Sequence, residues 1–276
     1  MVSQEQRRRQ LAREKFLRQQ QRRTESRRKA RMRNSVIASV LGVIVIGSVV
    51  LYTTDAFKKD DKKANASAET TPSASPTSKA PDPCAKPAAG SAKKLSWKKE
   101  PAMSIDTSAS YTMKLATTCG DIDIALKTAA APHTVNSFNF LAGKGFFDHT
   151  KCHRLTTTGI YVLQCGDPQG TGMGGPGYTI PDENLKDASL KGNTYPAGTV
   201  AMANTGQKHT GGSQFFLVYK NSPLPPNYAP FGTISGAGMK VLQKIAAAGA
   251  QPADPTTQNT APNATVVINK ATVTKS

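Results

Sequence analysis

Acidic residues, histidine and tryptophan are scarce in this sequence of 276 residues. It has 18 Asp and Glu against 36 Lys and Arg, with four histidines and one tryptophan. The histidines show no metal-ligand spacing, so no metal site is expected. A serine hydrolase is not expected either, because the serine in Gly211–Gln214 lacks the spaced Gly-x-Ser-x-Gly elbow and a convincing order of Asp and His partners.

The deficit of acidic charge is concentrated at the N-terminus. Residues 1–34 contain 13 Lys and Arg against three Glu, whereas the chain from Tyr111 onward contains 13 Lys and Arg against eight Asp and Glu. The formal net charge of +18 is therefore mainly a property of a basic tail, and a nucleic-acid partner is not expected. The tail can flank a membrane segment, bind anionic lipid or have a specific cytoplasmic role, and these interpretations stay open.

An uncharged apolar run of 18 residues occupies Ser35–Tyr52. As a helix it spans about 27 Å, most of a bilayer core. The basic residues before it predict a cytoplasmic N-terminus. We therefore predict a transmembrane helix over residues 35–54, a single-pass location in the cell membrane, and an extracytoplasmic position for everything that follows. A cleaved signal peptide is the alternative, disfavoured by the very long basic region before the run.

Residues 55–94 lack the apolar residues needed to form a core. They are rich in Ala, Pro, Ser, Thr and Lys, which predicts a disordered tether. The only tryptophan, Trp97, follows the tether, and we expect Trp97, Met103 and Ile105 to pack on the surface of the next domain. The sequence thus predicts a basic tail, a membrane helix, a tether and a folded domain, at residues 1–34, 35–54, 55–94 and 95–276.

From Tyr111 onward, short alternating segments are separated by Gly and Pro. Tyr111–Leu115 and Ile122–Leu126 flank a turn and predict a β-hairpin. Many short strands with only two helices indicate a mainly β fold, a closed or nearly closed antiparallel barrel. The glycine-rich segment 167–181 is expected to lack regular structure. Further strands are expected at 198–204, 213–219, 231–234 and 265–273, and helices at 132–142 and 239–248.

Residues 152–167 predict two short strands joined through a turn. This arrangement places Arg154 and Gln164 within reach of each other, with the apolar side chains of Tyr161 and Val162 between them. A planar charged donor beside an amide and an apolar surface suits a neutral peptide substrate.

Five ordered motifs resemble those of a known family. CHRL, QCGD, MANTG, GGSQFF and PPNYAPFGTI stand where the cyclophilin peptidyl-prolyl isomerases typically have FHRI, QGGD, MANAG, GSQFF and a closing VFG. The resemblance extends over essentially the whole domain after the tether. It implies an eight-stranded antiparallel cyclophilin-like barrel capped by two α-helices, and peptidyl-prolyl cis-trans isomerase activity.

The resemblance also implies a site that needs no nucleophile, metal or cofactor. Arg154 matches the family's catalytic arginine, and Gln164 matches the glutamine that hydrogen-bonds near it. Gln214 and Phe216 are two residues apart on a strand and face the same side, whereas Phe215 faces the core. The implied substrate-binding residues are Tyr161, Val162, Ala203, Asn204, Gln214, Phe216, Leu224 and Tyr228.

Three features depart from the better-known eukaryotic pattern. Pro223 replaces a tryptophan, Tyr228 replaces a histidine, and two extra residues lie between Arg154 and Gln164. These changes concern the rim of the pocket and cyclosporin binding rather than the reaction. His153 lies next to Arg154 and therefore faces the other side of its strand, which predicts a core histidine rather than a general base.

The four cysteines all follow the predicted membrane helix, in a compartment expected to be oxidising. Four cysteines allow three full pairings, and the sequence does not choose among them. We favour one disulfide within the set Cys119, Cys152 and Cys165, with Cys84 free or paired between molecules.

The sequence therefore predicts a membrane-anchored isomerase that acts on proline-containing segments of exported proteins during folding. A prolyl-peptide-binding chaperone or scaffold with little turnover is the alternative. In a second alternative the basic tail carries the function, as a cytoplasmic lipid or nucleic-acid binder.

Overall fold

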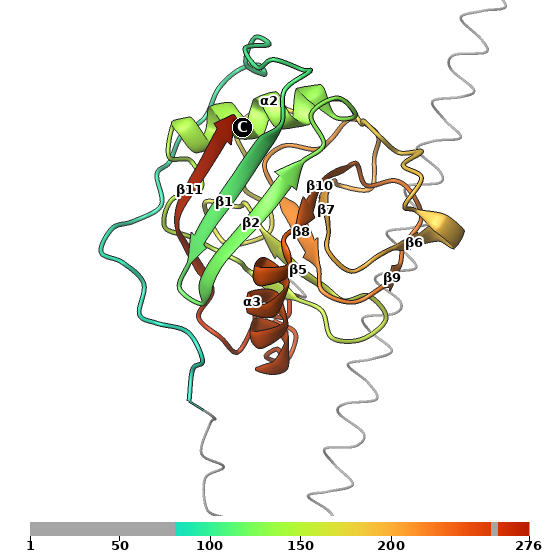
Figure 1. The fold of residues 1–276 in the computed structure, drawn as a ribbon. Helices are drawn as coiled ribbons and strands as arrows, with labels where there is room; N and C mark the ends of the chain where they lie inside the picture. Colours follow the sequence, from blue (N-terminus) through green and yellow to red (C-terminus); the bar gives the residue numbers. More distant parts are fainter. Residues whose placement is uncertain (1–80, 255–258, 276) are drawn as a thin grey trace, which may run out of the picture. The chain divides into compact units, whose positions relative to one another are not determined.

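Nine antiparallel strands form one curved sheet in a computed structural model of the protein, which describes residues 81–254 and 259–275. The strand order is β3-β11-β1-β2-β10-β7-β8-β5-β4 (Figure 1). The edge strands β3 (Thr150–Lys151) and β4 (Arg154–Leu155) are separated by only two residues of chain. The two edges of the sheet therefore meet at this junction, and the predicted mainly β antiparallel architecture is confirmed.

Besides β3 and β4, the described residues contain seven further strands of this sheet, two α-helices and a separate two-stranded sheet. The remaining elements are β1 (Tyr111–Thr117), β2 (Gly120–Leu126), α2 (Pro132–Gly143), β5 (Val162–Cys165), β7 (Thr199–Met202), β8 (Phe215–Val218), β10 (Pro230–Ile234), α3 (Gly236–Ala247), β11 (Val267–Lys275), the 3-10 turn Lys191–Asn193, and the separate pair of β6 (Thr194–Tyr195) and β9 (Ser222–Pro223).

The predicted count of eight strands is wrong, because the main sheet has nine strands within the described residues. The difference arises at Cys152–Leu155, which the sequence predicted as one strand. The N–H of Cys152 donates to the carbonyl oxygen of Val266 (3.0 Å), and the N–H of His153 donates to that of Gln164 (3.1 Å). The chain changes pairing partner here, from the side of β11 to the side of β5, and so forms two short strands.

Most predicted elements are found close to their expected positions. The β1–β2 hairpin is confirmed, with Tyr111 opposite Leu126. Helix α3 begins three residues before its predicted start because the Ser235 hydroxyl accepts the N–H of Gly238 (3.1 Å) and caps it. The separate β6–β9 pair was not predicted, since its strands are two residues each and carry no alternating pattern.

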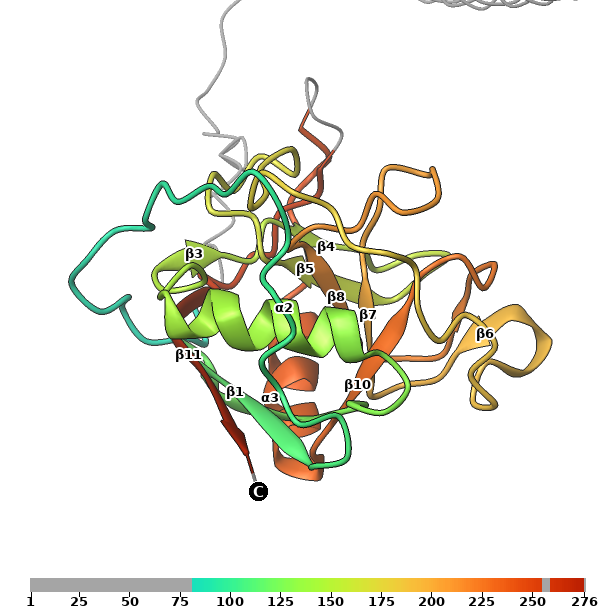
Figure 2. The same ribbon diagram turned by 90° about the horizontal axis from the view of Figure 1, so that it is seen from above.

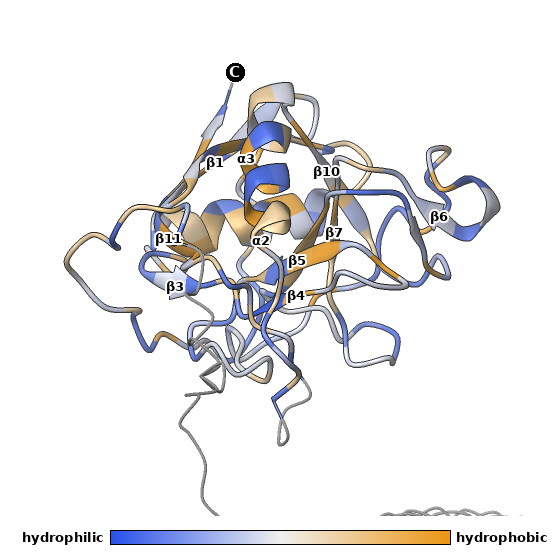
Figure 3. Cartoon of the chain, turned by 90° about the horizontal axis from the view of Figure 1, so that it is seen from below, coloured by the Kyte–Doolittle hydropathy of each residue, from blue (hydrophilic) through white to orange (hydrophobic). Residues whose placement is uncertain are grey.

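The main core lies against the curved sheet and includes side chains of both helices, among them Phe138 of α2 and Leu242 of α3. Phe138 on α2 is fully buried, and its ring lies 4.6 Å from Phe231, 5.2 Å from Phe147 and 5.5 Å from Phe215, measured between centroids. Figure 2 looks down on α2, which lies across this end of the sheet. Helix α3 lies toward the other end, and Figure 3 shows its two-sided character, with hydrophobic and hydrophilic residues alternating along it.

The predicted tail, membrane helix and first part of the tether lie outside the described residues. Within 81–254 and 259–275, no helix has the length and apolar character needed to cross a membrane.

Residues 81–110, here called the strap, follow the surface of the domain (Figures 1 and 2). The N–H of Ala85 donates to Thr118 O (2.8 Å), and the N–H of Ala88 donates to Asn269 Oδ1 (3.0 Å). The prediction of a disordered tether is therefore wrong for residues 81–94. Backbone hydrogen bonds and a disulfide hold this segment, and neither has a signature in amino-acid composition.

Trp97 packs on the domain, as predicted. Its ring lies 5.0 Å from that of Phe140 and 6.1 Å from that of Phe146. Ile105 is also buried, whereas Met103 remains 45% exposed, so the prediction holds for two of the three apolar strap residues.

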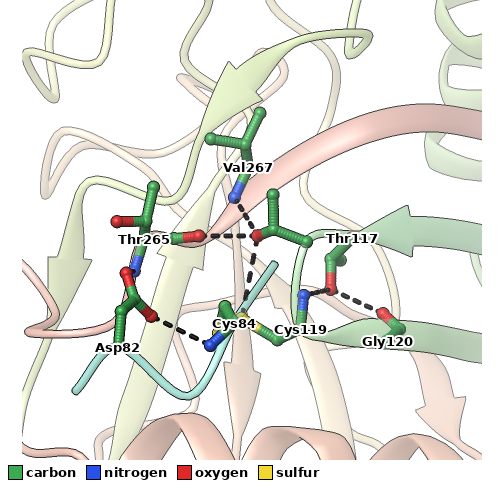
Figure 4. The surroundings of a disulfide bond; sticks show 8 residues. Asp82, Cys84, Thr117, Cys119, Gly120, Thr265 and Val267 are labelled. Atoms are coloured by element: carbon green, nitrogen blue, oxygen red, sulfur yellow. Dashed lines mark hydrogen bonds between the residues drawn. A yellow bond between two sulfur atoms is a disulfide. The ribbon is translucent and has the colours of Figure 1, made fainter. Parts of the chain in front are cut away.

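All four cysteines form disulfides, Cys84–Cys119 and Cys152–Cys165. The second bond lies within the set that the sequence favoured, but the prediction of a free or intermolecular Cys84 is wrong. Figure 4 shows how the strap is joined to the turn of the β1–β2 hairpin. Asp82 strengthens the junction, because its two carboxylate oxygens accept the N–H groups of Cys84 and Thr265, both at 2.9 Å.

Removing this bond with the double substitution Cys84→Ser and Cys119→Ser is expected to lower the free energy of unfolding by about 2–4 kcal/mol, because the disulfide closes a loop of moderate length in the unfolded chain. Urea denaturation followed by circular dichroism measures the loss. Ser91→Ala, an exposed change in the same strap, is the control and should leave the midpoint in place. An equal midpoint for the double variant would show that the bond contributes no stability.

Candidate active site

Arg154 and Gln164 lie opposite each other on the paired strands β4 and β5. The Arg154 Nη1 donates to Gln164 Oε1 at 3.1 Å, and both side chains are half-buried. The predicted proximity of these two residues is confirmed. A guanidinium carries five N–H groups, so this bond orients Arg154 and leaves most of its donors for another partner.

A row of side chains continues across the sheet from this pair. Gln164 pairs with Phe216 on β8, and Phe216 pairs with Ala201 on β7. Residues that lie directly opposite on neighbouring strands face the same side of a sheet, with strands about 4.8 Å apart. The charged donor, the amide and the aromatic ring are therefore neighbours on one face.

A chain of hydrogen bonds fixes the amides of this row. Gln164 Nε2 donates to Gln214 Oε1 (2.9 Å), and Gln214 Nε2 donates to the carbonyl oxygen of Gly174 (2.9 Å). Each amide thus accepts on one side and donates on the other. The chain runs from Arg154 to the glycine-rich loop, which the sequence correctly predicted to lack regular structure.

The side chain of Asp167 holds the glycine-rich loop through hydrogen bonds to the loop backbone. It is fully buried, and its carboxylate accepts the N–H groups of Gln169 (2.7 Å), Thr171 (2.9 Å) and Gly172 (2.6 Å). Burial by itself raises the pKa of Asp167, but the backbone N–H groups, including that of Gly174, outweigh it and hold the pKa below its ordinary value. Asp167 belongs to the motif QCGD, but it was not predicted to have a role in the site.

A second apolar cluster lies beside the row, separate from the main core. Phe216 and Val162 are buried in it, whereas Phe215 belongs to the main core, as the alternation of the strand predicted. Leu224 and Tyr228 are half-buried and pack against the cluster, so they form its exposed wall. The cluster consists of Val162, Tyr195, Ala201, Phe216 and Val218, with Ile160, Leu190, Ala203, Leu224 and Tyr228 packed against it.

Beyond Gln164 and Gln214 the surface forms a groove of about 1050 Å³. Ala203 and Asn204 line it, as does the loop that Asp167 holds. The N–H of Ala203 donates to Gln214 O (2.9 Å), and the Asn204 side-chain amide donates to Asn227 O (2.8 Å). These bonds hold the two residues that follow β7, Ala203 and Asn204, which the family resemblance implied as substrate-binding residues.

A family model described as "Cyclophilin type peptidyl-prolyl cis-trans isomerase/CLD" matches residues 112–273, more than half of the chain. The chain belongs to the cyclophilin family. The "Probable peptidyl-prolyl cis-trans isomerase B" of Mycobacterium leprae is 51% identical over 149 residues, which are 51% of this chain and 50% of the relative. The "Peptidyl-prolyl cis-trans isomerase B" of Bacillus subtilis is 46% identical over 117 residues, 41% of this chain and 76% of the relative.

The chain thus spans about half the length of the mycobacterial relatives that it matches. A solved cyclophilin-type isomerase of Cryptosporidium parvum is 25% identical and has a TM-score of 0.47, covering 60% of this chain and 99% of that one.

Tyr161, which was predicted to bind substrate, is not among the residues of the apolar cluster that contains Val162 and Phe216. Its ring contacts Tyr219 (5.9 Å between centroids), and the Lys220 ammonium lies 4.6 Å from its centroid. Ile160, the residue before it, packs against the apolar cluster instead. The role of Tyr161 in substrate binding stays a prediction, and motif matching did not point to Ile160.

Tyr195 was not predicted as a site residue, and it is fully buried in the apolar cluster, with its ring 6.1 Å from that of Phe216. Its hydroxyl donates to Tyr228 O (2.7 Å) and accepts the N–H of Tyr228 (3.1 Å). Burial raises the pKa of Tyr195 to about 12, so the hydroxyl stays protonated. Tyr195 therefore fixes the backbone that carries Tyr228, the residue that replaces a family histidine.

His153 is buried, as predicted for a core histidine. Burial, with a smaller contribution from the charge of Arg154, lowers its pKa, whereas Asp167 acts in the opposite direction. The imidazole is therefore neutral near pH 7, beneath the strand that presents Arg154.

Proposed function

We propose that the protein is a peptidyl-prolyl cis-trans isomerase in which Arg154 is the catalytic group. The row of Arg154, Gln164 and Phe216 on one face of the sheet carries this proposal. It sets a fixed cationic donor beside an apolar pocket of the kind that accepts a pyrrolidine ring.

The reaction is rotation about an X-Pro amide bond, whose barrier is about 18–20 kcal/mol. A rate gain of roughly five powers of ten requires about 7 kcal/mol of selective transition-state binding. In the twisted state, amide resonance is lost and the prolyl nitrogen lone pair becomes able to accept a hydrogen bond. The free N–H groups of Arg154 supply that bond, and the group stays charged at all relevant pH values.

The apolar pocket holds one side of the rotating bond. Phe216 and Val162 contact the ring of the proline, with Leu224 and Tyr228 as its outer wall. The extended peptide on either side lies along Ala203 and Asn204. The proline is then fixed while the preceding carbonyl rotates, and neither a nucleophile nor a cofactor takes part.

The proposed clients are proline-containing segments of exported proteins, and the proposed location is the outer side of the cell membrane, anchored by residues 35–54. Both disulfides support an oxidising compartment, because such bonds are rare in the cytosol. Protease added to intact spheroplasts should remove the domain and leave residues 1–34 protected. Protection of the domain would contradict this location.

Isomerase activity is tested with the full chain in detergent micelles, since a fragment beginning at residue 95 would leave Cys119 without its disulfide partner. Exchange spectroscopy on a short Ala-Pro peptide should show cis-trans interconversion well above the uncatalysed rate. Binding of the peptide without a rate gain would instead favour a prolyl-peptide-binding scaffold.

A further inference from the structure

The groove beside the site has one wall that does not come from the cyclophilin domain proper. Besides Gln164 and Gln169, three segments line it, namely the loop of residues 172–179, the region 203–214 and the strap residues Lys98, Lys99 and Glu100. The family match begins at residue 112, so the strap wall lies outside the part of the chain that the family model describes.

The strap is firmly held on both sides of these three residues. The N–H of Trp97 donates to Pro176 O (2.8 Å), and Asn136 Nδ2 donates to Pro101 O (3.2 Å). At Gly177 the approach is so close that a Cβ atom would lie 2.7 Å from Trp97 O. The backbone of Lys98 and Lys99 is therefore a fixed edge of the groove.

The charge of this edge is positive. Lys98 and Lys99 are exposed, and within the described residues neither lies within ion-pair distance of a carboxylate. Glu100, the single acidic residue of the lining, has its Oε1 at 3.3 Å from His133 Nδ1. Two ammonium groups against one carboxylate give this edge of the groove a net positive charge.

The groove is also continuous with the proposed catalytic site, because Gln164, Gln214 and Ala203 line it. An extended peptide advances about 3.3 Å per residue, so a few residues beyond the proline suffice to reach this part of the surface.

We propose that the strap selects substrates that carry an Asp or Glu within about three residues of the proline, bound by Lys98 and Lys99. This inference rests on the proposed isomerase function and adds a substrate class to it. The carboxylate contacts exposed ammonium groups, so the preference is electrostatic, modest in size and sensitive to salt.

The test uses the full chain and short peptides with one Ala-Pro bond, in which a single Glu, Gln or Lys is scanned over the three positions on each side of that bond. Exchange spectroscopy gives kcat/KM and chemical-shift titration gives Kd. At one or more positions, kcat/KM for the Glu peptide should exceed that for the Gln peptide about three- to tenfold at low salt, and the Lys peptide should be poorest. About 0.5 M salt should remove most of the difference.

Two variants locate the effect. Lys98→Gln with Lys99→Gln should bring the Glu peptide down to the level of the Gln peptide, and Lys98→Glu with Lys99→Glu should reverse the order so that the Lys peptide is preferred. Lys86→Gln with Lys94→Gln removes the same charge from exposed strap positions that do not line the groove, and it should keep the wild-type preference.

Equal values for Glu and Gln peptides in the wild type, or an undiminished preference in the Lys98/Lys99 variants, would overturn the inference while leaving the isomerase function intact. If no peptide is isomerised, the proposed function fails, and the Kd ratio of Glu to Gln peptides then decides by itself whether the strap selects acidic segments.

Discussion

Arg154→Ala is expected to lower kcat/KM for an Ala-Pro peptide by about 100- to 1000-fold, the usual loss when one preorganised donor to a transition state is removed. The half-buried guanidinium is held by Gln164. In the proposed mechanism it donates to the bond that rotates, so its removal should affect the transition state more than peptide binding. The Kd of the peptide should therefore change much less than kcat. Exchange spectroscopy and titration on the same samples separate the two.

The variant Arg154→Lys tests whether the planar guanidinium, and not only its positive charge, is needed. Lysine keeps the charge but lacks the planar fork, so we expect it to recover only a small part of the lost rate. Lys151→Ala, an exposed change on the neighbouring strand β3, is the matched control and should retain full activity. If Arg154→Ala folds normally and isomerises at the wild-type rate, the catalytic role assigned to Arg154 is wrong.

The row of Arg154, Gln164 and Phe216 could be predicted from the sequence, and the reason is physical. Strand residues alternate strictly between two faces, so once β5 and β8 are recognised, the sides of Gln164, Phe216 and Phe215 follow. Arg154 and Gln164 lie only ten residues apart in a local strand pair. Local geometry of this kind does not depend on the rest of the fold.

The residues that sequence reasoning missed depend on contacts between distant segments. Tyr195 bonds to Tyr228, 33 residues later, and Cys84 bonds to Cys119 across 35 residues. In the strap, a composition typical of disorder is overridden by a disulfide and by hydrogen bonds to backbone groups. Ile160, and not Tyr161, packs against the apolar cluster, and motif matching did not point to it.

Asp167 was also not predicted to have a role, because it acts on the site indirectly, through the loop that it holds. Its carboxylate fixes the backbone up to Gly174, whose carbonyl oxygen accepts from Gln214. A Cβ atom at Gly174 would overlap the Asp167 carboxylate, so the loop and the carboxylate fit each other closely. The hydrogen-bond chain that orients Arg154 thus ends on a buried negative charge.

Asp167→Asn is therefore expected to lower the free energy of unfolding by about 2–4 kcal/mol, because a buried charged acceptor of several N–H groups is replaced by an amide that turns a donor toward them. The loop should loosen, and kcat should fall more than peptide affinity as Gln214 and Gln164 lose their fixed orientation. Urea denaturation and peptide exchange measure the two effects. Gln169→Ala, an exposed side chain of the same loop, is the control.

The pH dependence of this loss separates a charge effect from a packing effect. The pKa of Asp167 in the folded protein lies below its ordinary value of 3.8, so the carboxylate's contribution is fully present above about pH 4 and disappears as the pH falls through the folded-state pKa. The difference in unfolding free energy between wild type and Asp167→Asn should accordingly be constant from pH 7 to pH 5 and shrink below about pH 4. A difference that stays constant down to pH 2.5 would mean that the shape of the side chain, and not its charge, holds the loop that positions Gln214 and, through it, Arg154.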